Sequence, residues 1–404
     1  MTRWQNLEAT LGSQGRPPWK VWCSASVVVI PALFFGAVWR LSNGLGRRAV
    51  VIGVNSSGIL TSFAPEVELL LRDFATWRRP PKWKIILSIG ITPNDALEDI
   101  YIRTEAHLKI VSQRSSTPEF MFWLFIERLN RSTSRGLRAK AKSTTYDRTM
   151  LWLEPARLNP SPDYAMLRRL GVQARKFVVV SSKQGAYYSW RLTQPLVPRQ
   201  AKNLRSNTTR IDNVPITQTA LAAQELRLRG FDVLRMGRVL EEPTPESMIA
   251  VQPWSAAADL VVFSSAALHL CGATGTWALS AIFNQRVLVH DLYELTARSF
   301  EYPRAWLILR QLHDRASGKT LSVEESLDVS DGRPWRLAEQ DPRFSLCLND
   351  PKLIARAANF VLDLDTDDPL KWPQPSLRER RLLETFLRRP YKPGNTSRVY
   401  LEDA

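Results

Sequence analysis

The sequence predicts an α/β protein built from two domains, each with a parallel β-sheet. In the C-terminal half, apolar runs of strand type at residues 231–234, 268–271 and 287–289 alternate with segments of helical composition at 219–229 and 277–283. Strands that alternate with helices favour a parallel sheet with crossover helices. The 404 residues are enough for two domains, and the hydrophobic content of 44% supports a folded core.

The N-terminal half repeats this alternation. Strands are predicted at residues 49–54, 83–89 and 108–111, and helices at 63–77 and 119–129. We therefore expect two Rossmann-like domains that face a cleft, preceded by a hydrophobic helix. The predicted regions are 1–42 (basic N-terminus and hydrophobic segment), 43–160 (N-terminal α/β domain), 161–348 (C-terminal α/β domain) and 349–404 (C-terminal helices and tail).

The charge and the cysteines restrict the class of partner. The net charge of +16 favours anionic partners such as nucleotides, anionic lipid surfaces or nucleic acid. A nucleic-acid patch would interleave aromatic residues with cations, but the basic segment 131–148 offers only Tyr146, so no nucleic-acid partner is expected. The three cysteines, Cys23, Cys271 and Cys347, show no disulfide or metal-ligand spacing. A reducing compartment and no bound metal are therefore expected.

Residues 21–39 contain no charge and are flanked by Lys20 and Arg40. As a helix this run would be roughly 28 Å long, close to the thickness of the bilayer's hydrocarbon core. Three interpretations stay open: a transmembrane anchor, a helix lying on the membrane, or a buried helix of the N-terminal domain. The first two predict a location at the cytoplasmic side of the inner membrane. The basic segment 131–148 would contact anionic lipid headgroups or a phosphate-bearing acceptor, or it is a solvated basic loop.

Polar and flexible residues follow the predicted strands of the C-terminal half. In open parallel sheets, ligands bind beyond the carboxyl ends of the strands, so we expect these residues to line one ligand-binding edge. They are, in chain order, Lys183, Arg235, Gly237, Gly272, Thr274, Gly275, Thr276, His290 and Asp291.

The loop at residues 272–276 carries the sharpest chemical prediction. Its glycines permit a positive φ and close approach of a ligand, and Thr274 or Thr276 can cap the helix predicted from Trp277. The free N–H groups and dipole of a helix start suit a phosphate. The alternative is an ordinary strand-to-helix turn with a threonine cap. The loop has neither the Walker spacing nor the G-x-G-x-x-G fingerprint.

Four stretches resemble the motifs of one protein family. They read Gly-Phe-Asp-Val-Leu-Arg-Met-Gly (230–237), Cys-Gly-Ala-Thr-Gly (271–275), Phe-Asn-Gln-Arg-Val-Leu-Val (283–289) and Ser-Gly-Lys-Thr-Leu-Ser (317–322). Residues 177–328 are similar to the C-terminal half of a family of bacterial glycosyltransferases with the GT-B architecture. A weaker similarity at residues 53–58 and 65–68 extends this resemblance to the N-terminal half.

The resemblance implies transfer of a sugar from a nucleotide-sugar donor to a glycan or lipid-linked acceptor in polysaccharide or glycolipid synthesis. A hexosyltransferase of this kind is expected to need neither a metal nor a cofactor. We expect Lys183, Arg235 and the 272–276 loop to bind the diphosphate, with Gly237 allowing close approach, while His290 and Asp291 reach the ribose, base or sugar. Asn55, Ser56 and Gly58 are expected on the acceptor side, and no residue is assigned as the general base.

Three positions differ from the family pattern. Lys183 stands nearest to a loop that contains arginine in the family, Asp212 replaces an arginine, and Arg286 replaces a proline. These changes favour a second possibility, a catalytically inactive subunit of the same fold at the membrane surface. Nucleotide-induced thermal stabilisation distinguishes the two.

The C-terminal region is predicted to contain two helices, at residues 349–364 and 376–389. The acidic run 363–368 between them resembles an Asp-x-Asp metal motif, but it lies beyond a helix end and is expected to be a solvated turn. The second helix is expected to pack on the first domain.

Overall fold

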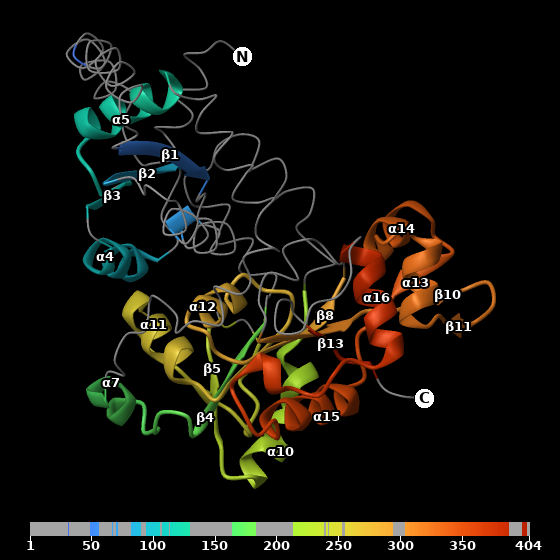
Figure 1. Cartoon of the computed structure of the whole chain (residues 1–404). Helices are drawn as coiled ribbons and strands as arrows, with labels where there is room; N and C mark the ends of the chain where they lie inside the picture. Colours follow the sequence, from blue (N-terminus) through green and yellow to red (C-terminus); the bar gives the residue numbers. More distant parts are fainter. Residues whose placement is uncertain are drawn as a thin grey trace. The chain divides into compact units, whose positions relative to one another are not determined.

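The computed structural model divides the chain into two compact units, Met1–Thr145 with Ser189–Ser206, and Tyr146–Tyr188 with Asn207–Ala404. We call these unit 1 and unit 2 and describe each by itself (Figure 1). The residues that the structure describes are 49–55, 82–89, 94–129 (except 106 and 113), 164–182, 213–293 (except 238, 239, 241, 253 and 254), 304–387 and 398–401, together with Pro31, Val67, Leu70 and Leu71.

Unit 2 contains a seven-stranded sheet in which every strand pair is parallel. Across the sheet the strands lie in the order β13-β9-β8-β7-β4-β5-β6. Their bounds are β4 (Phe177–Ser181), β5 (Asp232–Arg235), β6 (Ile249–Ala250), β7 (Leu268–Cys271), β8 (Val287–Leu292), β9 (Ala305–Leu309) and β13 (Arg398–Val399). The chain is therefore a mixed α/β protein with a large parallel sheet, as predicted.

The strand order fixes where a ligand crevice can form. Counted in chain order from β4 to β9, the first six strands lie as 3-2-1-4-5-6, which is the order of dinucleotide-binding sheets. The chain leaves β4 toward β5 on one side, and β7 pairs with β4 on the other side. Crevices in such sheets lie at this switch point, beyond the carboxyl ends of the two central strands.

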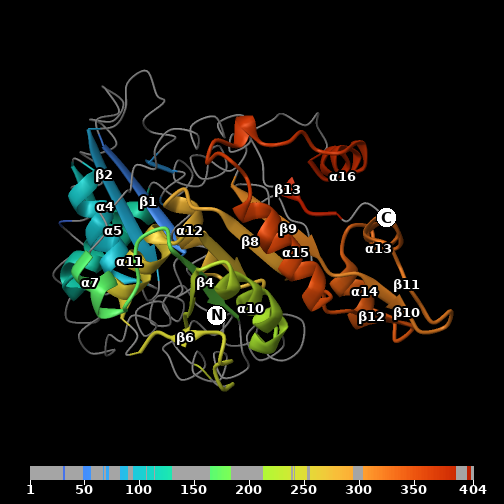
Figure 2. The same cartoon turned by 90° about the horizontal axis from the view of Figure 1, so that it is seen from below.

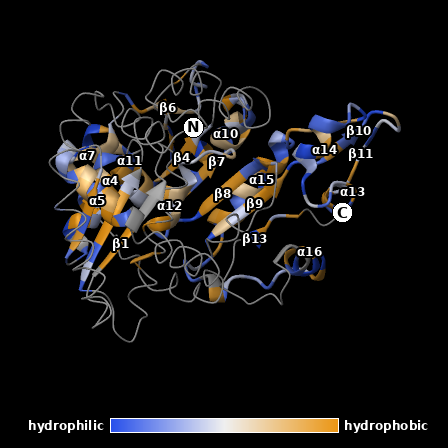
Figure 3. Cartoon of the chain, turned by 90° about the horizontal axis from the view of Figure 1, so that it is seen from above, coloured by the Kyte–Doolittle hydropathy of each residue, from blue (hydrophilic) through white to orange (hydrophobic). Residues whose placement is uncertain are grey.

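Helices cover both faces of the seven-stranded sheet. The helices α10 (Ala220–Leu228) and α15 (Pro351–Leu362) pack on one face, and α11 (Ala256–Ser265) and α12 (Trp277–Ile282) on the other (Figure 1). Figure 3 shows the strands between them in hydrophobic colours, as expected of a parallel sheet that is buried on both faces.

A small antiparallel sheet follows the carboxyl end of β9 in unit 2 (Figure 2). It consists of β10 (Leu312–Asp314), β11 (Lys319–Thr320) and β12 (Phe344–Leu346), in the order β11-β10-β12. The helices α13 (Val323–Val329) and α14 (Pro334–Gln340) accompany it. A Ser322–Glu325 capping box begins α13, because each residue's side chain bonds the other's backbone N–H. The sequence analysis predicted none of these elements.

Helix α16 (Leu377–Leu387) belongs to unit 2. Its expected packing on the first domain stays a prediction. Its carboxylate Glu379 accepts two hydrogen bonds from Arg398 of β13, at 2.6 and 2.7 Å. Arg378 of the same helix donates to Glu324 of α13. These two ion pairs connect α16 to elements of unit 2.

Unit 1 contains a parallel sheet in the order β1-β2-β3, with β1 (Ala49–Asn55), β2 (Trp83–Ile89) and β3 (Leu108–Val111). Helices α4 (Asp95–Thr104) and α5 (Thr117–Leu129) follow β2 and β3. The side chain of Asn94 caps α4 by accepting a hydrogen bond from the Leu97 N–H. All three strands and α5 were predicted, and α4 was missed.

Several predictions fall outside the described residues. They are the segments 21–39 (apart from Pro31) and 131–148, and the candidate site residues Lys183, Ser56 and Gly58. Among the helices that are described, none has both the length and the apolar character required to cross a bilayer. The three interpretations of residues 21–39 therefore stay predictions.

Candidate functional site

The switch point between β4 and β7 brings together residues from three segments. Ser181 is the last residue of β4 and pairs with Cys271, the last residue of β7. The predicted loop 272–276 follows β7 directly and leads into α12. The loop therefore lies where the strand order places a crevice, as its position at a strand end predicted.

Four hydroxyl groups and one imidazole form a continuous run of hydrogen bonds at this switch point. Ser280 Oγ lies 2.9 Å from Nδ1 of His269, and Nε2 of His269 lies 2.7 Å from Ser181 Oγ. Ser181 Oγ lies 2.8 Å from Thr276 Oγ1, which lies 2.6 Å from Thr274 Oγ1. We call these five residues the hydroxyl–histidine chain. It connects α12, β7, β4 and the 272–276 loop.

The histidine of this chain is neutral. His269 is fully buried within β7, and its ring lies 4.7 Å from that of Phe263 in α11, measured between centroids. Burial lowers the pKa of His269 from 6.5 to about 3. At neutral pH one ring nitrogen therefore donates a hydrogen bond and the other accepts one.

Thr276 stands at the N-cap of α12, but its hydroxyl makes no capping bond, so of the two expected caps Thr276 is not one. The side chain bonds Ser181 and Thr274 instead. The Thr274 hydroxyl accepts a hydrogen bond from the Thr276 N–H at 3.4 Å. Helix α12 has six residues. The hydroxyls at this site, and not a long helix dipole, are therefore the groups that can recognise a ligand.

Gly272 is required by packing. It does not have a positive φ, and a Cβ built on it would lie 3.1 Å from Cγ2 and 3.3 Å from Cβ of the buried Val214. We expect Gly272→Ala to lower the free energy of unfolding by about 1–3 kcal/mol through overpacking. In denaturant titrations, the double variant Gly272→Ala/Val214→Ala should lose less stability than the sum of the single variants. Additive losses, or no loss in Gly272→Ala, would contradict this account.

Arg235 is buried and holds a neighbouring loop. Its Nη1 donates to the Glu242 carbonyl oxygen at 2.7 Å and to Thr244 Oγ1 at 3.0 Å. Burial lowers the pKa of Arg235, and the Glu242 carboxylate offsets part of this shift. Because side chains alternate along a strand, Arg235 lies on the same face of the sheet as Val233, which is the face that α10 covers. Ser181 and His269 bond each other on the opposite face of the sheet, which α11 covers. The predicted contact of Arg235 with a diphosphate stays a prediction.

His290 and Asp291 were expected beyond the end of a strand, but β8 extends to Leu292 and includes both. A register irregularity interrupts β8 here, and Asp291 has a φ of 53°. Both side chains are fully buried, and His290 Nδ1 lies 2.7 Å from Asp291 Oδ2. The Asn349 N–H donates to the other carboxylate oxygen at 2.7 Å. Asp291 is therefore held from both sides.

The remaining candidate residues differ in what the structure records of them. Gly237, Gly275 and Thr276 are partly exposed, and Thr274 is 6% exposed. Asn55 is the last residue of β1 in unit 1. Of the predicted donor-binding residues, the structure thus brings Gly272, Thr274, Gly275 and Thr276 together in one loop.

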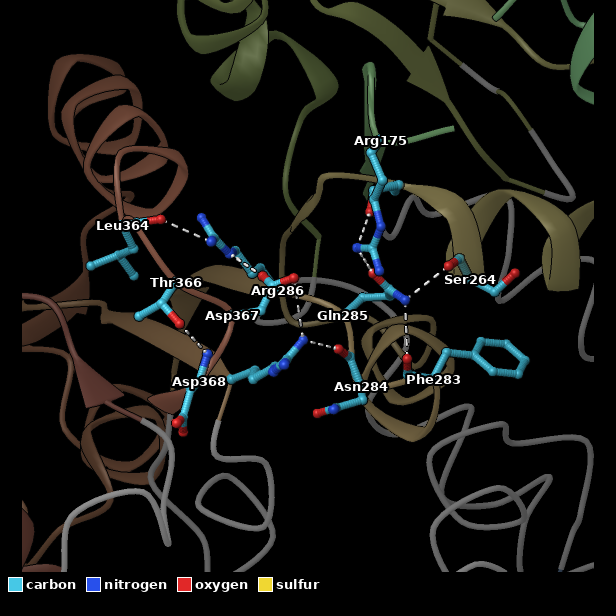
Figure 4. Close-up of polar contacts among 12 residues, drawn as sticks. Arg175, Ser264, Phe283, Asn284, Gln285, Arg286, Leu364, Thr366, Asp367 and Asp368 are labelled. Carbon is cyan, nitrogen blue, oxygen red and sulfur yellow. Dashed lines mark hydrogen bonds and ion pairs between the residues drawn. The ribbon is translucent and has the colours of Figure 1, made fainter. Parts of the chain in front are cut away.

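A second charged cluster lies at the amino ends of the strands, where Arg286 precedes β8 (Figure 4). Arg304 precedes β9 in the same way. Arg286 donates to Asp367 Oδ1 at 2.9 Å, to the Val361 carbonyl oxygen at 2.8 Å and to the Leu364 carbonyl oxygen at 2.9 Å. It therefore caps the C-terminal end of α15. Arg286 therefore has a structural role in this chain.

The acidic run 363–368 was expected to be a solvated turn, but two of its carboxylates form ion pairs. Asp367 pairs with Arg286, and Asp363 pairs with Arg229 of α10's C-terminal end. Burial alone raises the pKa of Asp367, but the cations Arg304 and Arg286 outweigh it, so the net shift is downward. Ligands of open α/β sheets bind beyond the carboxyl ends of the strands, whereas this cluster lies at their amino ends, so we interpret it as structural.

Sequence reasoning missed Ser181, His269 and Ser280. Each is a single polar residue within an otherwise apolar segment, such as the Leu-His-Leu-Cys of β7. A signal was present, because a polar side chain in a strand buried on both faces must find hydrogen-bond partners. For His269 these partners are Ser181 at the end of the neighbouring strand and Ser280 in the following helix.

The strand order and the polar switch point define an α/β protein whose large sheet is compatible with a Rossmann-like fold. No family model matches this chain, and no curated protein matches it.

Proposed function

We propose that this protein is a glycosyltransferase of the GT-B type that moves a sugar from a nucleotide-sugar donor to a glycan or lipid-linked acceptor. The observation that carries the proposal is the hydroxyl-rich switch point between β4 and β7, in a sheet with the 3-2-1-4-5-6 order. The parallel sheet of unit 1 supports a second α/β domain for the acceptor.

Sugar transfer requires stabilisation of the charge that grows on the departing nucleoside diphosphate. Preorganised hydrogen-bond donors meet this requirement because they need little reorganisation during the reaction. Thr274 and Thr276 are held in place by the hydroxyl–histidine chain, and the neighbouring Gly275 is partly exposed. The net charge of +16 favours a nucleotide sugar, which is an anion.

The sequence after β4 favours a mononucleotide over a dinucleotide. A dinucleotide-binding sheet carries G-x-G-x-x-G after its first strand, where the glycines let the pyrophosphate approach. Here that segment reads Ser181-Ser182-Lys183-Gln184-Gly185. A lysine in this segment favours a phosphate-bearing ligand.

We expect the full chain to bind at least one common nucleoside diphosphate and to transfer or hydrolyse the matching nucleotide sugar. Ligand at about 100 times its Kd stabilises the native state by about 2.7 kcal/mol, so Tm should rise by several degrees. Thr276→Val should reduce this rise, whereas the matched control Thr320→Val, in the exposed β11, should not. A Tm unchanged by every nucleoside diphosphate, together with no turnover of a nucleotide-sugar panel, would contradict the proposal.

A second candidate function keeps the fold without catalysis. It is a GT-B-like subunit that associates with the membrane surface through residues 21–39 and the basic segment 131–148. The burial of Arg235 favours it, because this cation is bound to Glu242 and Thr244. Membrane-vesicle binding without any nucleotide effect on Tm would support this candidate.

A further inference from the structure

The hydroxyl–histidine chain has a direction. A neutral imidazole donates from one nitrogen and accepts at the other, so His269 has two possible tautomers. Each hydroxyl supplies one proton, so the choice of tautomer sets the donor and the acceptor in every bond of the chain. The two directions differ in which end of the chain keeps an unused proton.

In the first direction, Nδ1 of His269 carries the proton and donates to Ser280 Oγ. The other hydroxyls then donate toward the imidazole, and the proton of Ser280 is left over. Ser280 is fully buried. Among the residues that the structure describes, the only hydrogen-bond partner of its hydroxyl is Nδ1 of His269. A buried hydroxyl proton without an acceptor has lost its hydrogen bond to water, which makes this direction unfavourable.

In the second direction, Nε2 of His269 carries the proton. Ser280 then donates to Nδ1, and Nε2–H donates to Ser181. Ser181 donates to Thr276, and Thr276 donates to Thr274. The unused proton belongs to Thr274, which is 6% exposed and lies in the loop at the switch point. This direction gives the fully buried Ser280 hydroxyl an acceptor, and the unused proton lies at Thr274, the end of the run that belongs to the 272–276 loop.

We infer that His269 is held as the Nε2–H tautomer and that the chain thereby presents the Thr274 hydroxyl as a hydrogen-bond donor to a diphosphate oxygen of the bound nucleotide. Ser280 and His269 are positioning residues, and Thr274 is the residue that touches the ligand. A donor fixed in this way is oriented before the ligand arrives. The assignment of the ligand rests on the proposed function, but the assignment of the tautomer does not.

Long-range ¹H–¹⁵N correlation spectra of the full chain, labelled on histidine, test the tautomer at about neutral pH. The two ring nitrogens have distinct ¹⁵N shifts according to whether they are protonated. Loss of a signal set in His269→Gln assigns the residue. If that variant does not fold, His107→Gln, His290→Gln and His313→Gln assign it by elimination. An Nε2–H ring is the expected result, and an Nδ1–H ring or a cationic ring overturns the inference.

Ser280→Ala tests the origin of the direction, because alanine removes the hydroxyl that bonds Nδ1. We expect the same spectra to show a mixture of tautomers in this variant, while a merely structural role of Ser280 would leave the tautomer unchanged. An unchanged Nε2–H ring in a folded Ser280→Ala protein overturns the role of Ser280.

Calorimetric titration with inorganic pyrophosphate, UDP and GDP tests the ligand. Thr274→Val should weaken binding about 10-fold or more, because it removes a hydrogen bond to a charged group, and Thr274→Ser should stay close to the wild type. Thr320→Val serves as the control. Equal affinity in wild type and Thr274→Val overturns the inference but leaves the proposed function intact. Absence of any binding contradicts the proposed function, and the tautomer is then decided by the spectra alone.

Discussion

Replacing Glu379 with glutamine is expected to lower the free energy of unfolding by about 3–5 kcal/mol. Glu379 and Arg398 are 4% and 5% exposed, and their side chains form a two-pronged ion pair. Glu379 also accepts a hydrogen bond from the Val399 N–H at 3.0 Å. Glutamine removes the negative charge and leaves a guanidinium buried, which is more costly than the absence of both partners.

Urea titration of the purified protein measures this loss, and two variants control it. Glu324→Gln removes a carboxylate that pairs with Arg378 in the same helix α16, but at a partly exposed site, so it should lose no more than about 1 kcal/mol. The apolar double variant Glu379→Leu/Arg398→Met should recover much of the stability lost in Glu379→Gln. Equal losses in Glu379→Gln and Glu324→Gln would show that burial does not strengthen the pair.

His269 is expected to make unfolding strongly dependent on pH in the acidic range. The imidazole of His269 takes up a proton near pH 6.5 in the unfolded state and only near pH 3 in the folded state. The contribution of His269 to the free energy of unfolding is therefore fully present above pH 6.5 and is lost as the pH falls toward 3. A single proton corresponds to about 1.4 kcal/mol per pH unit, or roughly 4–5 kcal/mol over the whole interval. In His269→Gln this component should be absent.

The measurement is the difference in unfolding free energy between wild type and His269→Gln at several pH values. Carboxylates titrate in both proteins and cancel, so the difference should shrink as the pH is lowered from 7 to about 4. His313→Gln is the matched control, since it removes a histidine that is partly exposed in β10. Parallel pH profiles for wild type and His269→Gln would contradict burial of a neutral imidazole.

The strands with compact apolar runs were predictable from the sequence. The bounds of β2, β3 and β7 agree with the predicted residues, because each run ends at polar or small residues. Helix α11 was missed because it is buried on almost all sides, so its sequence lacks the polar stripe of an amphipathic helix. The strands β6 and β13 have two residues each, and a pattern of that length carries no periodicity.

The candidate site was predictable in its position but not in its side-chain directions. Strand ends identified the 272–276 loop, since that argument depends only on strand direction. The orientation of Arg235 required counting which residues share a face with Val233, and this depends on the helices that cover each face. The role of His269 required knowing that Ser181 of one strand lies beside it, and a sequence does not give the pairing of strands that are distant in the chain.

The short strand β13 covers the backbone edge of β9. It pairs with β9, whose five residues Ala-Trp-Leu-Ile-Leu are apolar and whose Leu307 carbonyl oxygen accepts a hydrogen bond from Tyr400. An uncovered apolar edge strand is a template for intermolecular pairing and aggregation. Release of the two residues of β13 would therefore expose the backbone edge of β9 to pairing with another chain.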